Sequence, residues 1–159
     1  MARRLAAVMA ADVAGYSRLM HEDEESTHAA FNAAMSSFIV PSIRRHQGRI
    51  VKSTGDGFLA EFSSAVEAVR SALEFQEALM QDAVLRPPQQ RLLFRVGIDV
   101  GDVIMEEHDI FGDHVNIAAR LEQLCQPGGV LISDNARHYV NGRVDAKFHD
   151  MGERQVKNI

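Results

Sequence analysis

Residues 49–62 read Arg-Ile-Val-Lys-Ser-Thr-Gly-Asp-Gly-Phe-Leu-Ala-Glu-Phe. Branched and aromatic side chains on either side favour extended structure, and the Asp-Gly pair between them is a strong signal for a tight hairpin turn. The stretch therefore predicts two short strands, with the carboxylate of Asp56 at the hairpin tip and Lys52 just before it. An ammonium and a carboxylate at one turn suit a site for phosphate and metal. A solvated turn beside a surface lysine is the simpler explanation of this stretch taken alone.

The composition is that of an ordinary globular domain. The 159 residues fit one domain, 1–159, with 46% hydrophobic and 25% charged residues. The net charge of -5 argues against a nonspecific nucleic-acid binder, which needs a basic surface. The single Cys125 excludes an internal disulfide, and no apolar run approaches the length of a membrane span. We therefore expect a cytoplasmic protein with no membrane segment in this chain and no nucleic-acid partner.

The pattern of apolar residues predicts the other elements. Strands are expected at 5–11, 92–105, 130–133 and, as an extended piece, 146–149. Helices are expected at 28–46 with a kink at Pro41, at 65–85, at 113–124 and at 134–140. Ser64 and Glu67 form a capping-box pattern before the second of these helices, and Gly101 is expected to mark a bend or bulge. The order predicts an α+β fold: a ferredoxin-like βαββαβ core with an additional C-terminal helix and strands.

Asp12 ends the first predicted strand, which lies beside the hairpin in the middle of such a sheet. The two central strands can therefore bring Asp12 and Asp56 to one point, although they are far apart in the sequence. Divalent cations that also bind phosphate prefer one or two carboxylates, and two such cations can activate an attacking oxygen and stabilise a leaving one. Backbone N–H groups of residues 13–17, at a strand-to-helix turn, could cradle phosphates. Helix capping is the alternative explanation of Asp12.

Asn116 and Arg120 are four residues apart in the helix predicted at 113–124, so they share one face. The guanidinium of Arg120 offers a fixed fork of donors suited to phosphate, and the amide of Asn116 can bond a sugar or orient a base. A solvated helix face with Arg120 paired to a neighbouring acid is the alternative explanation.

Three motifs resemble those of the class III nucleotide cyclase catalytic domain, and they are most similar to its bacterial, rhizobial-type members. They are Ala-Asp-Val-Ala-Gly-Tyr-Ser at 11–17, Lys-Ser-Thr-Gly-Asp-Gly-Phe at 52–58 and Asp-Ile-Phe-Gly-Asp-His-Val-Asn-Ile-Ala-Ala-Arg at 109–120. The motifs occur in the family's order, and the resemblance covers nearly the whole chain. It implies an adenylate cyclase that converts ATP to 3′,5′-cyclic AMP and pyrophosphate.

The resemblance also implies a role for each matching residue. Asp12 and Asp56 would bind two divalent cations, Mg²⁺ or Mn²⁺. Lys52 and Asp109 would read the purine, Asn116 would position the ribose or the transition state, Arg120 would stabilise the transition-state phosphate, and Lys157 would bind the triphosphate. Family members form head-to-tail homodimers with composite sites, in which one subunit supplies the two metal-binding aspartates and the other supplies the remaining residues. Relatives continue beyond the position of Lys157, so we expect this chain to be a domain excised from a larger protein.

The proposed purine pair also has a chemical rationale. The ammonium of Lys52 is donor-only and can donate to adenine N1, while the ionised carboxylate of Asp109 is acceptor-only and can accept from the exocyclic amine. Guanine presents the reverse pattern at these two places, and the guanylate-forming relatives typically carry Glu and Cys there. The pair therefore predicts selection of ATP.

Two other functions compete with this one. The first is a degenerate cyclase-homology domain that binds a nucleotide or a partner as a regulatory module. The second is a ferredoxin-like RNA-binding module, whose sheet should display stacked aromatic residues and basic residues. The chain is acidic and contains only 6% aromatic residues, which disfavours RNA binding.

Overall fold

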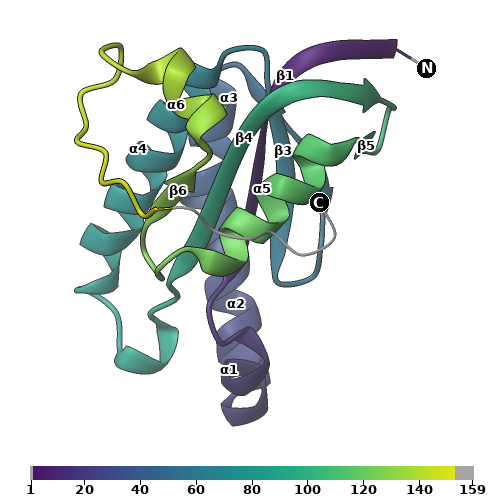
Figure 1. Ribbon diagram of the computed structural model, residues 1–159. Coiled ribbons are helices and arrows are strands. Elements are labelled where there is room, and N and C mark those ends of the chain that lie inside the picture. The colour runs from purple at the N-terminus through teal and green to yellow at the C-terminus, as the bar shows by residue number, and fades with distance from the viewer. Residues whose placement is uncertain (1, 153–159) are drawn as a thin grey trace.

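The computed structural model describes residues 2–152, and Figure 1 shows a single mixed sheet with helices on both faces. The elements are β1 (Ala2–Val13), α1 (Tyr16–Glu22), α2 (Glu24–Ala34), α3 (Val40–Arg45), β2 (Gly48–Ser53), β3 (Gly57–Phe62), α4 (Ala65–Ala83), β4 (Phe94–Met105), β5 (Ile110–Phe111), α5 (Asp113–Leu124), β6 (Val130–Ile132) and α6 (Asp134–Val140). A π-helical turn (Met35–Ile39) joins α2 to α3, and a 3₁₀ turn (Pro88–Gln90) follows α4. No helix in this part of the chain is both long and apolar enough to cross a membrane.

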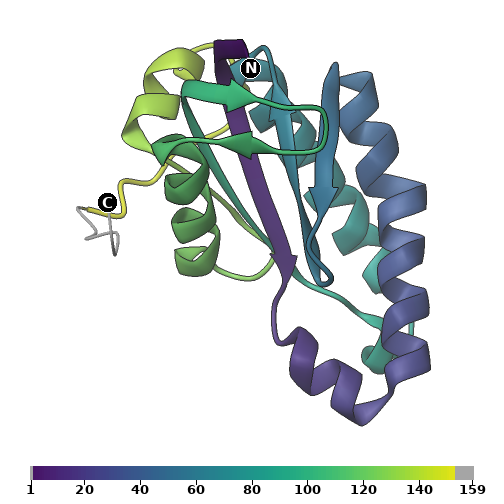
Figure 2. The same ribbon diagram turned by 90° about the vertical axis from the view of Figure 1, so that its right-hand side faces the viewer.

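The strand order confirms the ferredoxin-like core. The sheet runs β2-β3-β1-β4-β5 with antiparallel neighbours, and β6 pairs parallel to β4. The long β1 and β4 pair over their whole lengths and curve together at one end of the sheet (Figure 1). This curvature carries the β4–β5 hairpin across the face of β1 toward β2 (Figure 2).

From Ala6 onward, the central strand β1 is largely buried on both faces because helices cover it from either side. On one face Met9, Phe58 and Phe94 pack against α2, α3 and α4. On the other face, Val8 and Leu59 belong to a smaller apolar cluster with Ala118 of α5. Burial of both faces explains why the sequence of β1 is an almost continuous apolar run.

Two glycines of β4 let α5 lie directly on the sheet. A Cβ at Gly97 would overlap the backbone of α5 at Ala118 and Glu122, and a Cβ at Gly101 would overlap the ring of His114. The bulge expected as one possibility at Gly101 does not form, because β4 runs through this residue in regular register opposite Ala6. The glycine is required there by helix packing and not by backbone conformation.

Several predicted boundaries shift for local reasons. The helix expected at 28–46 begins at Glu24, after an N-cap from the side chain of Asp23. Its π-helical turn, in which the Val40 N–H donates to the Met35 carbonyl, directly precedes Pro41, whose missing N–H cannot continue the regular ladder. No strand forms at 146–149, so within the described residues the C-terminal additions end with α6 and a coil.

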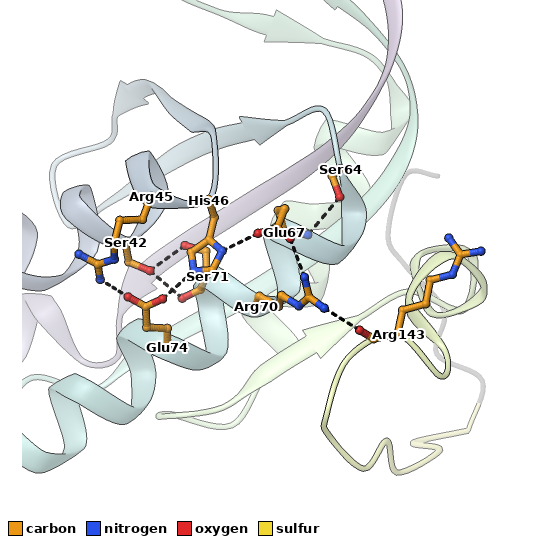
Figure 3. Close-up of polar contacts among 9 residues, drawn as sticks. All are labelled: Ser42, Arg45, His46, Ser64, Glu67, Arg70, Ser71, Glu74 and Arg143. Atoms are coloured by element: carbon orange, nitrogen blue, oxygen red, sulfur yellow. Dashed lines mark hydrogen bonds and ion pairs between the residues drawn. The ribbon is translucent and has the colours of Figure 1, made fainter.

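A polar cluster fastens α3 to α4 (Figure 3). The Nδ1 of His46 lies 2.7 Å from Glu67 Oε1, and its Nε2 lies 2.6 Å from Glu74 Oε2. Both ring nitrogens can donate at once only in the imidazolium form. Burial lowers the pKa of His46, but the hydrogen bonds to Glu67 and Glu74 outweigh it, so the net shift is upward. Ser64 caps α4 as predicted, although the carboxylate of Glu67 bonds His46 and Arg70 rather than completing the capping box.

Candidate active site

The hairpin brings Asp56 to the end of β1 that carries Asp12. Asp12 lies opposite Gly57 in the β1–β3 register, and the Val13 N–H donates to the Asp56 carbonyl at 2.9 Å. The turn adopts its left-handed conformation at Gly55, with φ 88°. Gly57 is a glycine for another reason: a Cβ there would overlap the Ala11 carbonyl of β1. The hairpin was predicted correctly, but the second glycine serves strand packing rather than the turn.

The two carboxylates affect one another electrostatically. Burial raises the pKa of Asp56, and the neighbouring charge of Asp12 raises it further. Two carboxylates that repel each other at one point form a set of hard oxygen ligands to which a divalent cation would bind favourably. The described residues contain no group of three or more His, Cys, Asp or Glu side chains arranged around a metal position. Oxygens from a nucleotide phosphate and from water would therefore have to complete any coordination shell.

Arg95 is a residue of this site that the sequence analysis missed. It lies opposite Asp12 in the β1–β4 register, and its guanidinium binds the carboxylate in a bidentate manner, with Nε–Oδ1 3.0 Å and Nη2–Oδ2 2.8 Å. The alternation of side chains along β4 predicts the face of the sheet on which Arg95 lies. Only the register between β1 and β4 shows that its partner is Asp12. The pair means that Asp12 is already neutralised by a cationic group of the chain.

Glu122 joins this cluster from α5. Its Oε2 lies 3.6 Å from Arg95 Nη2 and, among the described residues, accepts no hydrogen bond. Burial first and Asp12 second raise the pKa of Glu122 to about 8. The neutral acid is therefore favoured near neutral pH, and Arg95 pairs mainly with Asp12.

Lys52 and Asp109 are in direct contact. Nζ of Lys52 lies 3.1 Å from Oδ2 of Asp109, and Oδ1 of Asp109 accepts from the Ile110 N–H at 2.8 Å. Burial acts to raise the pKa of Asp109, but the Ile110 N–H and Lys52 together lower it, so the carboxylate is ionised. The structure thus joins the two residues expected to read the purine.

Asn116 and Arg120 lie one turn apart on α5, as expected. Asn116 is exposed, and Nη1 of Arg120 lies 3.1 Å from Oε1 of Gln123. Across residues 2–152, no hydrogen bond or ion pair joins Asn116 or Arg120 to the aspartates at 12 and 56 or to the 52–109 pair. Lys157 is outside the described residues. The roles of all these side chains stay predictions.

The sequence of residues 3–158 matches the family described as the adenylate and guanylate cyclase catalytic domain. The chain belongs to this family. The cyclase domain is 50% identical over 157 residues to a Rhizobium meliloti protein named "Putative adenylate cyclase 3", a match that covers 99% of this chain and 27% of that protein.

Solved structures agree with this assignment. A protein from Silicibacter pomeroyi described as an adenylate/guanylate cyclase/hydrolase superposes with a TM-score of 0.93 at 45% identity, covering 99% of the cyclase domain and 92% of that chain. The guanylyl cyclase Cya2 superposes with a TM-score of 0.82 at 25% identity, covering 99% and 88%. The cyclase domain spans about a quarter of the length of its Rhizobium relative.

Proposed function

We propose that this cyclase domain is an adenylate cyclase, which forms 3′,5′-cyclic AMP and pyrophosphate from ATP. The contact between Lys52 and Asp109 carries the choice of base. A donor-only ammonium and an ionised acceptor-only carboxylate 3.1 Å apart can reach adjacent atoms on one edge of a base. Adenine offers an acceptor at N1 beside a donor amine, which matches this pair, and guanine offers the reverse. The name of the Rhizobium relative supports the same choice.

The carboxylates of Asp12 and Asp56 fit the binding of two divalent cations, Mg²⁺ or Mn²⁺. When bound, such cations would lower the pKa of the ribose 3′-hydroxyl and neutralise the departing pyrophosphate. Arg95, which binds Asp12, also brings to this site a guanidinium of the kind that suits phosphate. Asn116 and Arg120 would position the ribose and stabilise the phosphate undergoing in-line attack, because such displacements depend on positioning and electrostatics.

The proposed active unit is a head-to-tail homodimer in the cytoplasm. Asn116 and Arg120 form no hydrogen bond or ion pair with Asp12 or Asp56 within the described part of one chain, which fits a site that two subunits complete. A two-fold interface would then give two equivalent sites. One subunit would supply the two aspartates, and the other would supply α5 and the 52–109 pair.

One observation favours a second candidate function. Arg95 binds both carboxylate oxygens of Asp12, which is a proposed metal ligand. This arrangement would fit a regulatory module that binds nucleotide without turnover. The two functions are distinguished by incubating the purified chain with ATP or GTP and Mn²⁺, followed by mass spectrometry of the product. We expect cyclic AMP from ATP, with much less cyclic GMP from GTP. Nucleotide binding without product would favour the regulatory module, and preferred formation of cyclic GMP would contradict the proposed choice of base.

A further inference from the structure

A bulge in β2 places two basic side chains on the same face of the sheet. Arg49 and Lys52 are three positions apart, so a regular strand would direct them to opposite faces. The register passes from Ile50 opposite Ala60 to Lys52 opposite Leu59, which leaves Val51 as the extra residue. Arg49 opposite Glu61 and Lys52 opposite Leu59 therefore lie on one face, under the turn that precedes β5.

The side chain of Arg49 holds that turn through hydrogen bonds to backbone carbonyls of the turn. Residues 106–109 form a turn closed by the Glu106 N–H, which donates to the Asp109 carbonyl at 2.9 Å. Nη1 of Arg49 donates to the Glu107 carbonyl at 3.2 Å, and Nη2 donates to the Glu106 carbonyl at 3.4 Å. The rigid fork of a guanidinium can bridge two adjacent carbonyls, whereas a lysine ammonium is a point charge.

Glu61 orients the guanidinium of Arg49 by binding its Nε. Its carboxylate is buried, with 5% of the side chain exposed, and it accepts from Arg49 Nε at 2.8 Å. Nη2 of Arg4 donates to both of its oxygens, at 2.6 and 2.7 Å. A buried carboxylate is costly unless it is paired and hydrogen-bonded, so Glu61 strongly favours the rotamer of Arg49 that reaches the turn.

The turn itself has little else to hold it. The side chains of Glu107 and His108 are each 87% exposed, and the strand that follows, β5, is two residues long. An exposed turn without buried side chains samples many conformations unless its backbone is tied down. Asp109 sits at the end of this turn, where it meets Lys52.

We propose that Arg49 is a positioning residue for base recognition: it anchors the 106–109 turn so that Asp109 stands opposite Lys52. The inference rests on the proposed function, because it assumes that the Lys52–Asp109 pair reads the purine. Arg49 itself touches no substrate in this scheme. Its effect on specificity passes through the backbone of the turn.

Arg4 provides a matched control. It binds the same carboxylate of Glu61 and is similarly exposed, but among the described residues it donates to no carbonyl of the turn. Arg4→Gln and Arg49→Gln remove the same charge from the same buried partner. A merely structural role for Arg49 predicts equal effects of the two substitutions, whereas a positioning role predicts a difference in base selection.

The experiment compares kcat/KM for ATP and for GTP in the full chain. We expect Arg49→Gln to lower the ATP-to-GTP ratio by about tenfold, mainly through a higher KM for ATP, because Lys52 and Asp109 lose their relative geometry. Arg4→Gln should leave the ratio unchanged, and Arg49→Lys should restore part of it. Hydrogen–deuterium exchange of the peptide spanning 104–112 should rise in Arg49→Gln and stay unchanged in Arg4→Gln. If the wild-type chain forms no cyclic nucleotide, the same ratio is taken from the dissociation constants of ATP and GTP.

The variant Lys52→Glu with Asp109→Cys distinguishes a failure of the proposed Arg49 role from a failure of the proposed base reading. If this variant shifts the ratio and Arg49→Gln does not, the base-reading pair stands and the role of Arg49 is overturned. Equal shifts in Arg49→Gln and Arg4→Gln would overturn it as well. If the Lys52→Glu, Asp109→Cys variant leaves the ratio unchanged, the proposed base reading fails, and the positioning role fails with it.

Discussion

Nζ of Lys52 lies 3.1 Å from Oδ2 of Asp109, although the residues are 57 positions apart. Lys52 belongs to β2 and Asp109 directly precedes β5, and these two strands are at opposite ends of the strand order. The paired strands β1 and β4 curve together, and the turn before β5 therefore returns over β2 (Figure 2). A donor-only group and an acceptor-only group thus face each other on an open part of the sheet. This contact motivates the first prediction.

Exchanging the pair should exchange the preferred base. Lys52→Glu with Asp109→Cys should weaken the use of ATP and raise the relative use of GTP, because the donor and acceptor positions are then reversed. A site that relies on such hydrogen bonds discriminates strongly, since the wrong base leaves the recognising polar groups unpaired. The measurement is kcat/KM for both nucleotides. An unchanged ratio would mean that these residues do not read the base.

Substituting either aspartate should abolish most of the cyclase activity, but the two substitutions should have different effects on the stability of the fold. Asp56→Asn should reduce cyclase activity by about a hundredfold or more and leave the melting temperature equal or higher. Burial and Asp12 raise the pKa of Asp56, so its ionised form is unfavourable in the folded chain. Asp12→Asn should also be inactive but should melt lower, because Arg95 loses its bidentate partner.

Asp102→Asn is the matched control for both aspartate substitutions. Asp102 is an exposed carboxylate on β4, so its substitution should change neither activity nor melting temperature. Substantial turnover by a folded Asp56→Asn protein would contradict the assignment of Asp56 to the metal site. Circular dichroism and calorimetry establish whether each variant is folded.

Mixing two inactive proteins should restore activity if the sites are composite. Asp56→Ala and Arg120→Ala chains should each be inactive alone. In a heterodimer, one site receives both substituted residues and the other receives none, so partial activity should return on mixing. The measurement is cyclic AMP formation after subunit exchange, with exchange itself followed by mass spectrometry of the intact dimers. Exchange without recovery would indicate a site built within a single chain.

The stability of the α3–α4 junction should depend on pH through His46. The raised pKa of His46 means that its stabilising effect is complete below about pH 6.5 and is lost as the pH rises through the folded-state pKa. The hydrogen bond to His46 lowers the pKa of Glu67, whereas for Glu74 burial is outweighed by Arg45 and His46. Both glutamates therefore stabilise the folded chain fully above pH 4.5, and this stabilisation is lost as the pH falls below that value.

The His46→Gln variant should accordingly have a lower melting temperature than the wild type between pH 4.5 and pH 6.5. A loss of about 2–4 °C is expected for about 1 kcal/mol in a chain of this length. The difference should shrink as the pH rises above 6.5 and through the raised folded-state pKa of His46, where the wild-type imidazolium deprotonates. His138→Gln is the control, because His138 is an exposed histidine of α6. A difference in melting temperature that does not vary with pH would contradict the proposal that His46 is an imidazolium in the junction. Figure 3 shows the contacts of His46 there.

Local features of the fold were predictable because they depend on neighbouring residues. The Ser64 cap and the apolar stripe of α4 are encoded within a few positions of where they act. The same holds for the Asn116–Arg120 face of α5, which follows from helical spacing alone. The strand order also followed, since the alternation of strands and helices admits few arrangements.

Features that depend on strand register and curvature were decided only by the tertiary structure. The sequence gives the face on which Arg95 lies, but only the β1–β4 register sets it opposite Asp12. The steric need for glycine at 57 and 97 arises from chain segments that pack against them from elsewhere in the sequence. The bulge at Val51 and the curvature of β1 and β4 together bring Lys52 under Asp109. These are long-range pairings, and they form because the whole sheet and its helices bury their apolar faces together, which no short stretch of sequence specifies.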